Sequence, residues 1–256
     1  MTRNYLDMNN INYEDANYPV RANFAETHNR FWDRLATPGA WLSGAQKVAI
    51  AKEIRQSHDC DLCQQRKEAL SPYQIKGDHQ TASGELSNTI VEMVHRIVTD
   101  SARITKNWFD GLKDQGLKPE EYVEILGTIV HTFAVDEFCR GLGIPLNELP
   151  EPKAGKPSGY LPENASYDGG AWVPLLPHFI EEGPEADLWN GYGANVIRAL
   201  SVTPDEVRSL IDLFESHYIT ADSIVGDWTI CPHGGLSRIE IEVVATRVSS
   251  HNDCFY

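Results

Sequence analysis

Apolar residues recur at spacings of three and four along most of the chain, a period that is typical of amphipathic α-helices, and strict alternation is rare. This pattern predicts an all-α fold. Short connections between the early helices indicate a helix bundle. The expected helices cover about residues 24–36, 43–57, 60–70, 86–98, 101–115, 119–142, 187–200, 204–217 and 237–251.

Two of these helices carry boundary signals. Pro119 stands at a first-turn position, and Gly143 followed by Pro145 predicts the end of that helix, whose apolar interior is expected to be deeply buried. Thr203 and Glu206 have the spacing of a capping box at the start of a later helix.

A stretch of nineteen positions occurs twice without a gap, once from Leu42 to Cys60 and once from Leu236 to Cys254. An internal repeat indicates two related structural units. We expect the two repeat helices to pack as a pseudo-symmetric pair. The identical positions are Leu42/Leu236, Ser43/Ser237, Ala51/Ala245, Asp59/Asp253 and Cys60/Cys254.

The repeat and the distribution of Pro and Gly divide the chain into four parts. Residues 1–22 form a polar arm, 23–150 a first helical unit with the CxxC pair, 151–184 a Pro/Gly-rich linker, and 185–256 a partial second unit. The linker is expected to pack along the surface through the apolar anchors Tyr160, Trp172 and Leu175.

The composition excludes several classes of partner. The chain of 256 residues has a net charge of −15 and a sequence pI near 4.9, and such a surface repels phosphates, so nucleic acids and membranes are not expected partners. No apolar run has the length of a membrane span or a signal sequence, which favours a cytoplasmic protein. The odd number of cysteines, five, argues against a secreted disulfide framework.

Only Cys60 and Cys63 form a recognisable cysteine pair, and they lie where a helix is expected to start, with Asp59 as a possible N-cap. A thiolate at a helix N-terminus is stabilised by unpaired N–H groups, and a second thiol three residues on can resolve a sulfenic acid into a disulfide. The pair therefore indicates redox chemistry. Two buried structural thiols, or a zinc site that would need His79, His58 or another cysteine, are the alternatives.

The chain resembles the alkylhydroperoxidase AhpD-like and carboxymuconolactone decarboxylase-like proteins, sometimes labelled peroxidase-related. The resemblance rests on LSGAQKVAIAKEIRQSHDCDLC, on VEILGTIVHTFAVDEFCRGLGIPL and on a second partial copy, LSRIEIEVVATRVSSHNDCFY. It implies an AhpD-like helical bundle with a truncated second copy of the repeat, and a thiol-dependent peroxidase that reduces a hydroperoxide. The resemblance also implies that Cys63 attacks the hydroperoxide and that Cys60 resolves the product.

The family's peroxidatic pattern is Glu, eleven residues, then Cys-x-His-Cys, with a further His four residues after the second Cys. In the first unit Val48, Leu62 and Lys67 stand at the Glu position and at the two His positions, so the family's proton relay is missing there. The second unit keeps the acid as Glu242, before Cys254.

Other side chains near the thiols can substitute for this relay. Lys67 or Arg66 can lower a thiol pKa by charge, and His58 or His79 can carry protons. We therefore take as candidate catalytic residues Cys60, Cys63, Lys67 and Glu242.

The resemblance also implies the partners. These are a hydroperoxide or another small-molecule substrate and a thiol reductant protein that restores the dithiol. No organic cofactor is implied and no metal is assigned. A homodimer or a higher homo-oligomer is expected.

Two polar residues stand on the most apolar of the expected helices, where buried polar side chains need partners. These are His131 and Asp136, which we take as candidate substrate-pocket residues; Glu124 shares a helix face with His131. A satisfied core histidine and an internal ion pair are the alternatives. His95 is expected to be a core or surface residue and is assigned no role, and Cys139 is expected to act as a small buried hydrophobic residue.

Two other functions stay open. The first is a non-catalytic, metal-binding or small-molecule-binding AhpD-like relative whose relay has decayed, as Val48, Leu62 and Lys67 suggest. The second is a decarboxylase-like enzyme that uses a general base, such as Glu124 or His131, in place of thiols.

Overall fold

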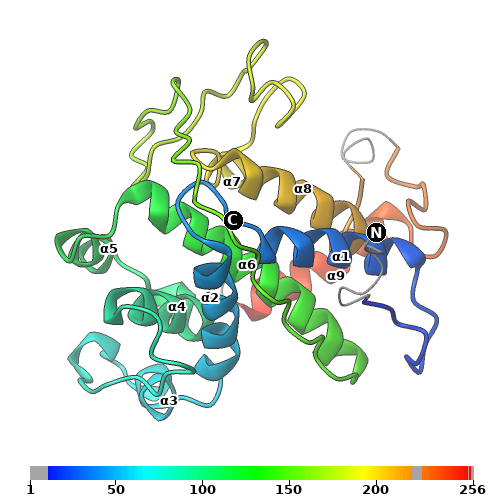
Figure 1. Cartoon of the computed structure of the whole chain (residues 1–256). Helices are drawn as coiled ribbons and strands as arrows, with labels where there is room; N and C mark the ends of the chain where they lie inside the picture. Colours follow the sequence, from blue (N-terminus) through cyan, green and yellow to red (C-terminus); the bar gives the residue numbers. More distant parts are fainter. Residues whose placement is uncertain (1–10, 221–226, 253, 255–256) are drawn as a thin grey trace, which may run out of the picture.

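The computed structural model describes residues 11–220, 227–252 and 254, and these form nine α-helices, two short 3-10 turns and no β-strand (Figure 1). The predicted all-α class is confirmed. The helices are α1 (Ala22–Ala36), α2 (Gly44–Ser57), α3 (Asp61–Glu68), α4 (Asn88–Asp100), α5 (Lys106–Asp114), α6 (Pro119–Leu142), α7 (Asn195–Arg198), α8 (Pro204–His217) and α9 (Arg238–His251). The 3-10 turns are η1 (Pro72–Gln74) and η2 (Ser101–Arg103).

Two expected helices are shorter than predicted. The helix expected at 101–115 divides into η2 and α5, because Thr105 interrupts it and caps α5 by accepting a hydrogen bond from the Trp108 amide. The helix expected at 187–200 is reduced to α7, since Gly191 takes a left-handed backbone conformation with φ of +77° just before it.

The core of the bundle is built around α2 and α6. Helix α2 packs against α1, α4 and α6, and α6 also packs against α8. Ile50 and Ile54 of α2 and Ile125 of α6 are fully buried, which confirms the buried interior expected for the long helix. Burial of each such side chain stabilises the folded state by about 1.5–3 kcal/mol. The packing of α2 and α6 therefore supports the helices that position the site.

The two repeat helices begin alike but pack differently. Ser43 and Gln46 form a capping box at α2, and Ser237 and Glu240 form the same box at α9. However, α9 has no extensive contact with another helix among the described residues, and its Val243 is 60% exposed. The expected pseudo-symmetric packing of α2 with α9 is therefore not formed.

The linker region runs as loops over one end of the helices, at the top of Figure 1. The Lys153 amide donates to the Ala36 carbonyl at 2.8 Å. Leu175 is buried, and the Trp172 ring lies 5.7 Å from an aromatic ring of α5. Tyr160 is exposed, and its hydroxyl donates to the carboxylate of Glu185, just after the linker. The expected packing is confirmed for Leu175 and Trp172, whereas the expectation that Tyr160 is an apolar anchor is wrong, because its ring is exposed.

The described part of the N-terminal arm lies on α1. Ile11 is buried, and the Tyr13 hydroxyl is 2.5 Å from Nδ1 of His28. The earlier part of the arm, residues 1–10, lies outside the described residues.

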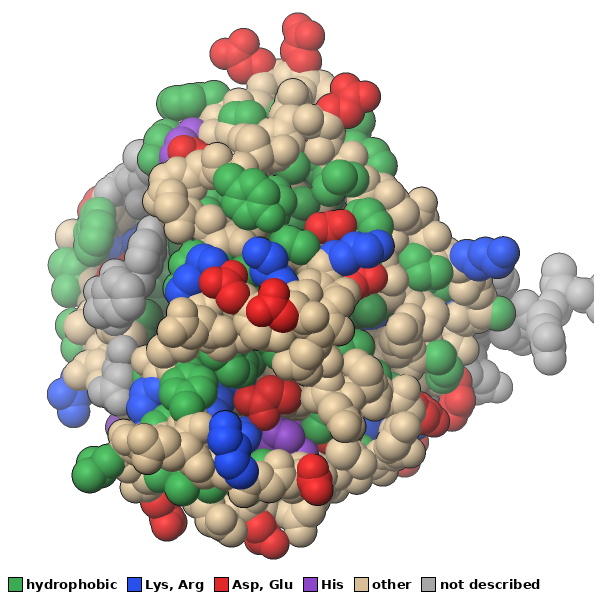
Figure 2. Space-filling model, turned by 90° about the vertical axis from the view of Figure 1, so that its left-hand side faces the viewer, with side chains coloured by type: hydrophobic (Ala, Val, Ile, Leu, Met, Phe, Trp, Pro, Cys, Tyr) green, Lys and Arg blue, Asp and Glu red, His purple; other side chains and the backbone are tan. Residues whose placement is uncertain are grey.

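No helix in the described ranges combines the length and the hydrophobicity that crossing a membrane requires. Figure 2 shows acidic and basic side chains interspersed on the face toward α3, α4 and α5, without an extended basic patch on that face. That face therefore lacks the concentrated positive charge that binding to phosphates requires.

Candidate functional site

The two cysteines of the CxxC pair lie at the N-terminus of α3, as expected. Cys60 is itself the N-cap residue, so the assignment of the N-cap to Asp59 is wrong. Cys63 follows in the first turn. Both thiols are buried, with Cys60 0% and Cys63 3% exposed, so any reagent must enter the protein to reach them.

Two histidines from other parts of the chain face these sulfurs. His79 comes from the long connection between α3 and α4, and its Nδ1 lies 3.5 Å from Sγ of Cys60 and 3.6 Å from Sγ of Cys63. His95 comes from α4, and its Nδ1 lies 3.2 Å from Sγ of Cys63. The two imidazole rings have centroids 4.2 Å apart. Cys60, Cys63, His79 and His95 are hereafter called the thiol–imidazole centre.

Each imidazole is held on its far side by a carboxylate. Nε2 of His95 lies 2.7 Å from Oε1 of Glu53, which is on α2 and 1% exposed. Nε2 of His79 lies 2.8 Å from Oε2 of Glu92 on α4, and Arg66 donates to the same oxygen at 2.7 Å. Because a carboxylate only accepts, a neutral imidazole here carries its proton on Nε2 and directs the Nδ1 lone pair at the sulfurs.

Contacts in and around the centre shift the pKa values of His79 and Glu92. Burial lowers the pKa of His79, but contacts with Cys63, Glu92 and Cys60 outweigh burial and raise it to about 10. Burial raises the pKa of Glu92, but His79 and Arg66 outweigh it and bring the pKa to about 2. Without a metal ion, these contacts make His79 a cation beside two sulfurs.

The pKa values of Cys60 and His95 are both lowered. Burial raises the pKa of the Cys60 thiol, yet hydrogen bonds from the Cys63 and Gln80 amides and from His79 bring it below its usual value. Burial and the neighbouring charge of His79 lower the pKa of His95, against the opposing effect of Glu53. The centre thus favours a thiolate at Cys60 and a neutral imidazole at His95.

Sequence reasoning identified the two cysteines and named His79, but it gave His95 no role and did not single out Glu53 or Glu92. The signal that could have found them is their position. Glu53 stands between buried residues of α2, and Glu92 and His95 are three apart on α4, where a buried polar side chain needs a partner.

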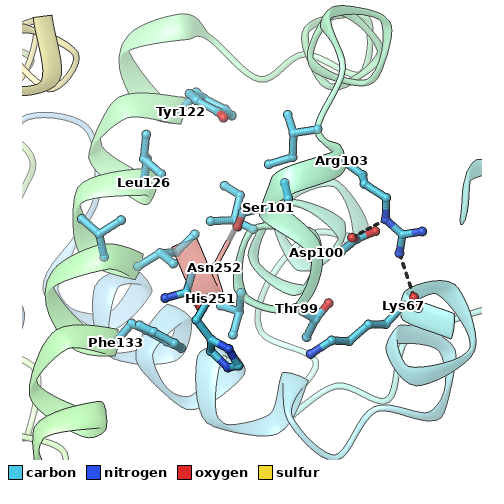
Figure 3. Close-up of a pocket in the computed structure, with 16 residues that line it drawn as sticks. Lys67, Thr99, Asp100, Ser101, Arg103, Tyr122, Leu126, Phe133, His251 and Asn252 are labelled. Carbon is cyan, nitrogen blue, oxygen red and sulfur yellow. Dashed lines mark hydrogen bonds and ion pairs between the residues drawn. The ribbon is translucent and has the colours of Figure 1, made fainter. Parts of the chain in front are cut away.

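Two of the candidate catalytic residues, Lys67 and Glu242, do not contact the sulfurs of Cys60 and Cys63 in the described structure. Lys67 is exposed and lines a cavity of about 790 Å³ bounded by α4, η2, α6 and the end of α9 (Figure 3). Glu242 accepts a hydrogen bond from Arg238, its neighbour on α9, at 2.6 Å. The groups that contact the sulfurs are His79 and His95, and Glu92 and Glu53 contact the far nitrogens of these rings.

The two candidate substrate-pocket residues lie apart from the thiols. Both oxygens of Asp136 are bound by Arg55 at 2.8 Å, so this residue belongs to an internal ion pair. His131 is 1% exposed, and its Nδ1 lies 3.2 Å from Oε2 of Glu206. The capping box expected at Thr203 does not form, because Glu206 turns toward α6 instead of its own helix start.

A smaller cavity of about 410 Å³ is lined by Glu124 and Glu206. Glycines leave room for both carboxylates, since a Cβ on Gly39 would stand 1.8 Å from Glu124 Oε1 and one on Gly127 would stand 2.2 Å from Glu206 Oε2. Burial, and then the charge of Glu206, raise the pKa of Glu124 to about 7.

This raised pKa predicts a pH-dependent stability. Because Glu124 has a usual value of 4.5 and a folded pKa of about 7, folding is penalised progressively as the pH rises through that window. Glu124→Gln should therefore stabilise the protein by about 2–3 kcal/mol at pH 8 and have little effect at pH 5. Denaturant unfolding at both pH values measures this, with exposed Glu137→Gln on the same helix as the control. An equal effect of Glu124→Gln at both pH values would contradict the prediction.

A scan against protein-family models finds no match to this chain, and searches of curated proteins and of solved structures find none either.

Proposed function

We propose that the protein is a thiol-dependent oxidoreductase of the AhpD-like type, in which Cys60 and Cys63 reduce a hydroperoxide. The observation that carries this proposal is the chain of contacts from Cys63 Sγ to His95 Nδ1 at 3.2 Å and from His95 Nε2 to Glu53 at 2.7 Å. A thiol, an imidazole and an orienting carboxylate in this order form the arrangement that activates a nucleophile. It supplies the proton relay that is missing at Val48, Leu62 and Lys67.

The chemistry assigns a separate role to each sulfur. His95 accepts the proton of Cys63, and the thiolate attacks the terminal oxygen of the hydroperoxide, which breaks the O–O bond and leaves a sulfenic acid. The departing alkoxide takes a proton and leaves as an alcohol. Cys60 then attacks the sulfur of Cys63, which gives a disulfide and water. A dithiol protein restores both thiols and is itself oxidised.

Cys63 is the better candidate for the attacking residue on geometry as well as on resemblance. Its sulfur contacts both His79 and His95, whereas the only histidine that contacts the sulfur of Cys60 among the described residues is His79. The buried position of both sulfurs requires that the segment carrying His79 moves aside to admit a hydroperoxide. That segment lies on the surface, and Pro72 is its one buried residue between 69 and 87.

The proposal extends to location and assembly. A reduced dithiol persists in a reducing compartment, which is why the cytoplasm is the proposed location. A dithiol reductant protein and a homodimer or higher homo-oligomer are the proposed partners.

Mass spectrometry tests the proposed activity. One equivalent of tert-butyl hydroperoxide added to the reduced, metal-free protein is expected to form the Cys60–Cys63 disulfide rapidly, and Cys63→Ser should abolish it. Glu53→Gln should slow the reaction by about 100-fold, because it weakens the orientation and basicity of His95. Cys231→Ser is the matched control, since Cys231 is exposed and outside the centre. Thiols that stay reduced in the wild-type protein would refute the activity.

The alternative function, a metal-binding AhpD-like relative, is favoured by a different observation. Four atoms that can coordinate a metal, two sulfurs and two imidazole nitrogens, converge in the thiol–imidazole centre. The two functions use the same residues, and only the second requires a metal ion among them.

A further inference from the structure

The four ligand atoms of the thiol–imidazole centre have the spacing of a metal site. One ligand atom from each of Cys60, Cys63, His79 and His95 lies within 4.8 Å of all the others. In a tetrahedral zinc site, bonds of about 2.3 Å to sulfur and 2.0–2.1 Å to nitrogen place a sulfur and a nitrogen about 3.6 Å apart. The observed sulfur to nitrogen distances are 3.5, 3.6 and 3.2 Å.

The orientation of the ligands agrees with the spacing. Nδ1 of His79 is almost equidistant from the two sulfurs, which is the position of a group arranged around a shared central atom. Glu53 and Glu92 bind the Nε2 atoms of His95 and His79, and so fix both rings with Nδ1 inward. In zinc sites, a histidine ligand usually donates its other ring N–H to a carboxylate of the outer shell.

We propose that Cys60, Cys63, His79 and His95 bind one zinc ion through two thiolate sulfurs and two Nδ1 atoms when the cysteines are reduced. Two thiolates and two imidazoles select a soft or borderline ion with tetrahedral preference, which is zinc among the common divalent ions. The four protein ligands complete the coordination, so the ion is structural and has no open position for a substrate. Cys60, Cys63 and His95 are buried, and His79 is partly buried.

The bound ion adds a cross-link between α3, α4 and the connection that joins them; α3 and α4 also pack against each other. Cys60 and Cys63 are at the start of α3, His95 is on α4, and His79 lies in the connection between these helices. This connection buries little apolar surface. A cross-link at His79 therefore fixes it against the bundle.

The proposed peroxidase function, on which this further step rests, gives the ion a second role. A hydroperoxide and two protons react with the zinc-bound centre to give the Cys60–Cys63 disulfide, an alcohol, water and a free zinc ion. The two electrons pass from the two sulfurs to the O–O bond. Since a disulfide is a poor zinc ligand, oxidation releases the metal, and reduction allows it to bind again.

Metal analysis of the reduced full-length protein tests the site. We expect one zinc ion per chain, and a cobalt-substituted protein with the visible absorption and thiolate-to-metal charge transfer of a tetrahedral sulfur site. Cys63→Ser and His79→Ala should each lose both signals, whereas Cys231→Ser should keep them. Circular dichroism checks that the variants fold, and His79→Ala is useful here because His79 is not in a helix. A wild-type protein that binds no zinc when it is added in excess would overturn the proposal.

The carboxylates provide a finer test. Glu92→Gln is expected to weaken zinc binding by about 10–100-fold, measured by competition with a chromophoric chelator. Glu68→Gln is the matched control, because Glu68 is an exposed carboxylate on α3. Equal affinities of the two variants would contradict the assignment of Glu92 as the group that orients His79.

Release of zinc on oxidation separates this inference from the proposed activity. Tert-butyl hydroperoxide is added to the zinc-loaded protein with a zinc indicator, and disulfide formation is followed by mass spectrometry in parallel. Release of one zinc for each disulfide supports both. Zinc binding with thiols that stay reduced even in the metal-free protein would refute the peroxidase and the release but support the site. Rapid disulfide formation in a protein that never binds zinc would support the peroxidase and overturn the site.

Discussion

Removal of zinc from the reduced protein is expected to lower its midpoint of thermal unfolding by roughly 10 °C. An ion present at about a thousand times its dissociation constant stabilises the folded state by about 4 kcal/mol, provided that the unfolded chain does not bind it. In a protein of this size, 1 kcal/mol corresponds to about 2–4 °C. The proposed ligands come from α3, α4 and the connection between them, so their loss should loosen this side of the bundle first.

Calorimetry with and without a strong chelator measures this shift, and hydrogen exchange locates it. Protection should fall first in α3 and in residues 69–87. Cys63→Ser is the control, since a variant that cannot bind zinc should unfold at the same temperature with or without the chelator. A chelator that extracts the metal from the wild-type protein without changing its unfolding would show that the ion does not support the fold.

The fold was predictable where local signals decide the structure. Pro119 and Gly143 bound α6 as expected, because a proline is tolerated at a helix start and the C-cap glycine takes a φ of +67°. The short α7 was not predictable from apolar spacing alone. Gly191 and the turns around it favour a non-helical backbone there, and the spacing of apolar residues does not reveal this preference.

Apart from His79, which the sequence offered as one of several proton carriers or zinc ligands, the site was predictable only in the part that is contiguous in sequence. Cys60 and Cys63 are three residues apart, so their spacing alone indicated chemistry. His95 and Glu53 are separated by 42 residues, and only the packing of α2 on α4 brings them to 2.7 Å. His79 comes from a connection without a regular hydrophobic period, so no sequence pattern predicts that its ring faces the sulfurs.

The two repeat helices share their local structure but not their packing. Ser43 and Ser237 form equivalent capping boxes, because a cap depends only on residues three positions apart. The environment of each helix depends on distant partners. Ile54 of α2 is fully buried, whereas Val248 at the matching position of α9 is 55% exposed.

Asp136→Ala is expected to lower the free energy of unfolding by about 3 kcal/mol. Asp136 is fully buried, and its two oxygens accept from Nε and Nη2 of Arg55 at 2.8 Å. Removal of one partner from a buried ion pair costs about 3–5 kcal/mol, because the other charge stays in the interior. The side chain of Arg55 is 22% exposed and donates to the Asn147 carbonyl, so partial hydration puts the cost at the lower end of this range.

The adjacent residue provides a matched control for this substitution. Glu137 pairs with Arg140 on the exposed side of α6, with side chains 43% and 33% exposed, and such surface pairs contribute about 0–1 kcal/mol. Glu137→Ala should therefore change stability by less than about 1 kcal/mol. Urea unfolding of both variants, with Arg55→Ala and the double variant to complete the cycle, measures the coupling. If Asp136→Ala and Glu137→Ala cost the same, the Arg55 pair does not hold α2 against α6, and the substrate-pocket role expected for Asp136 becomes the better explanation of its burial.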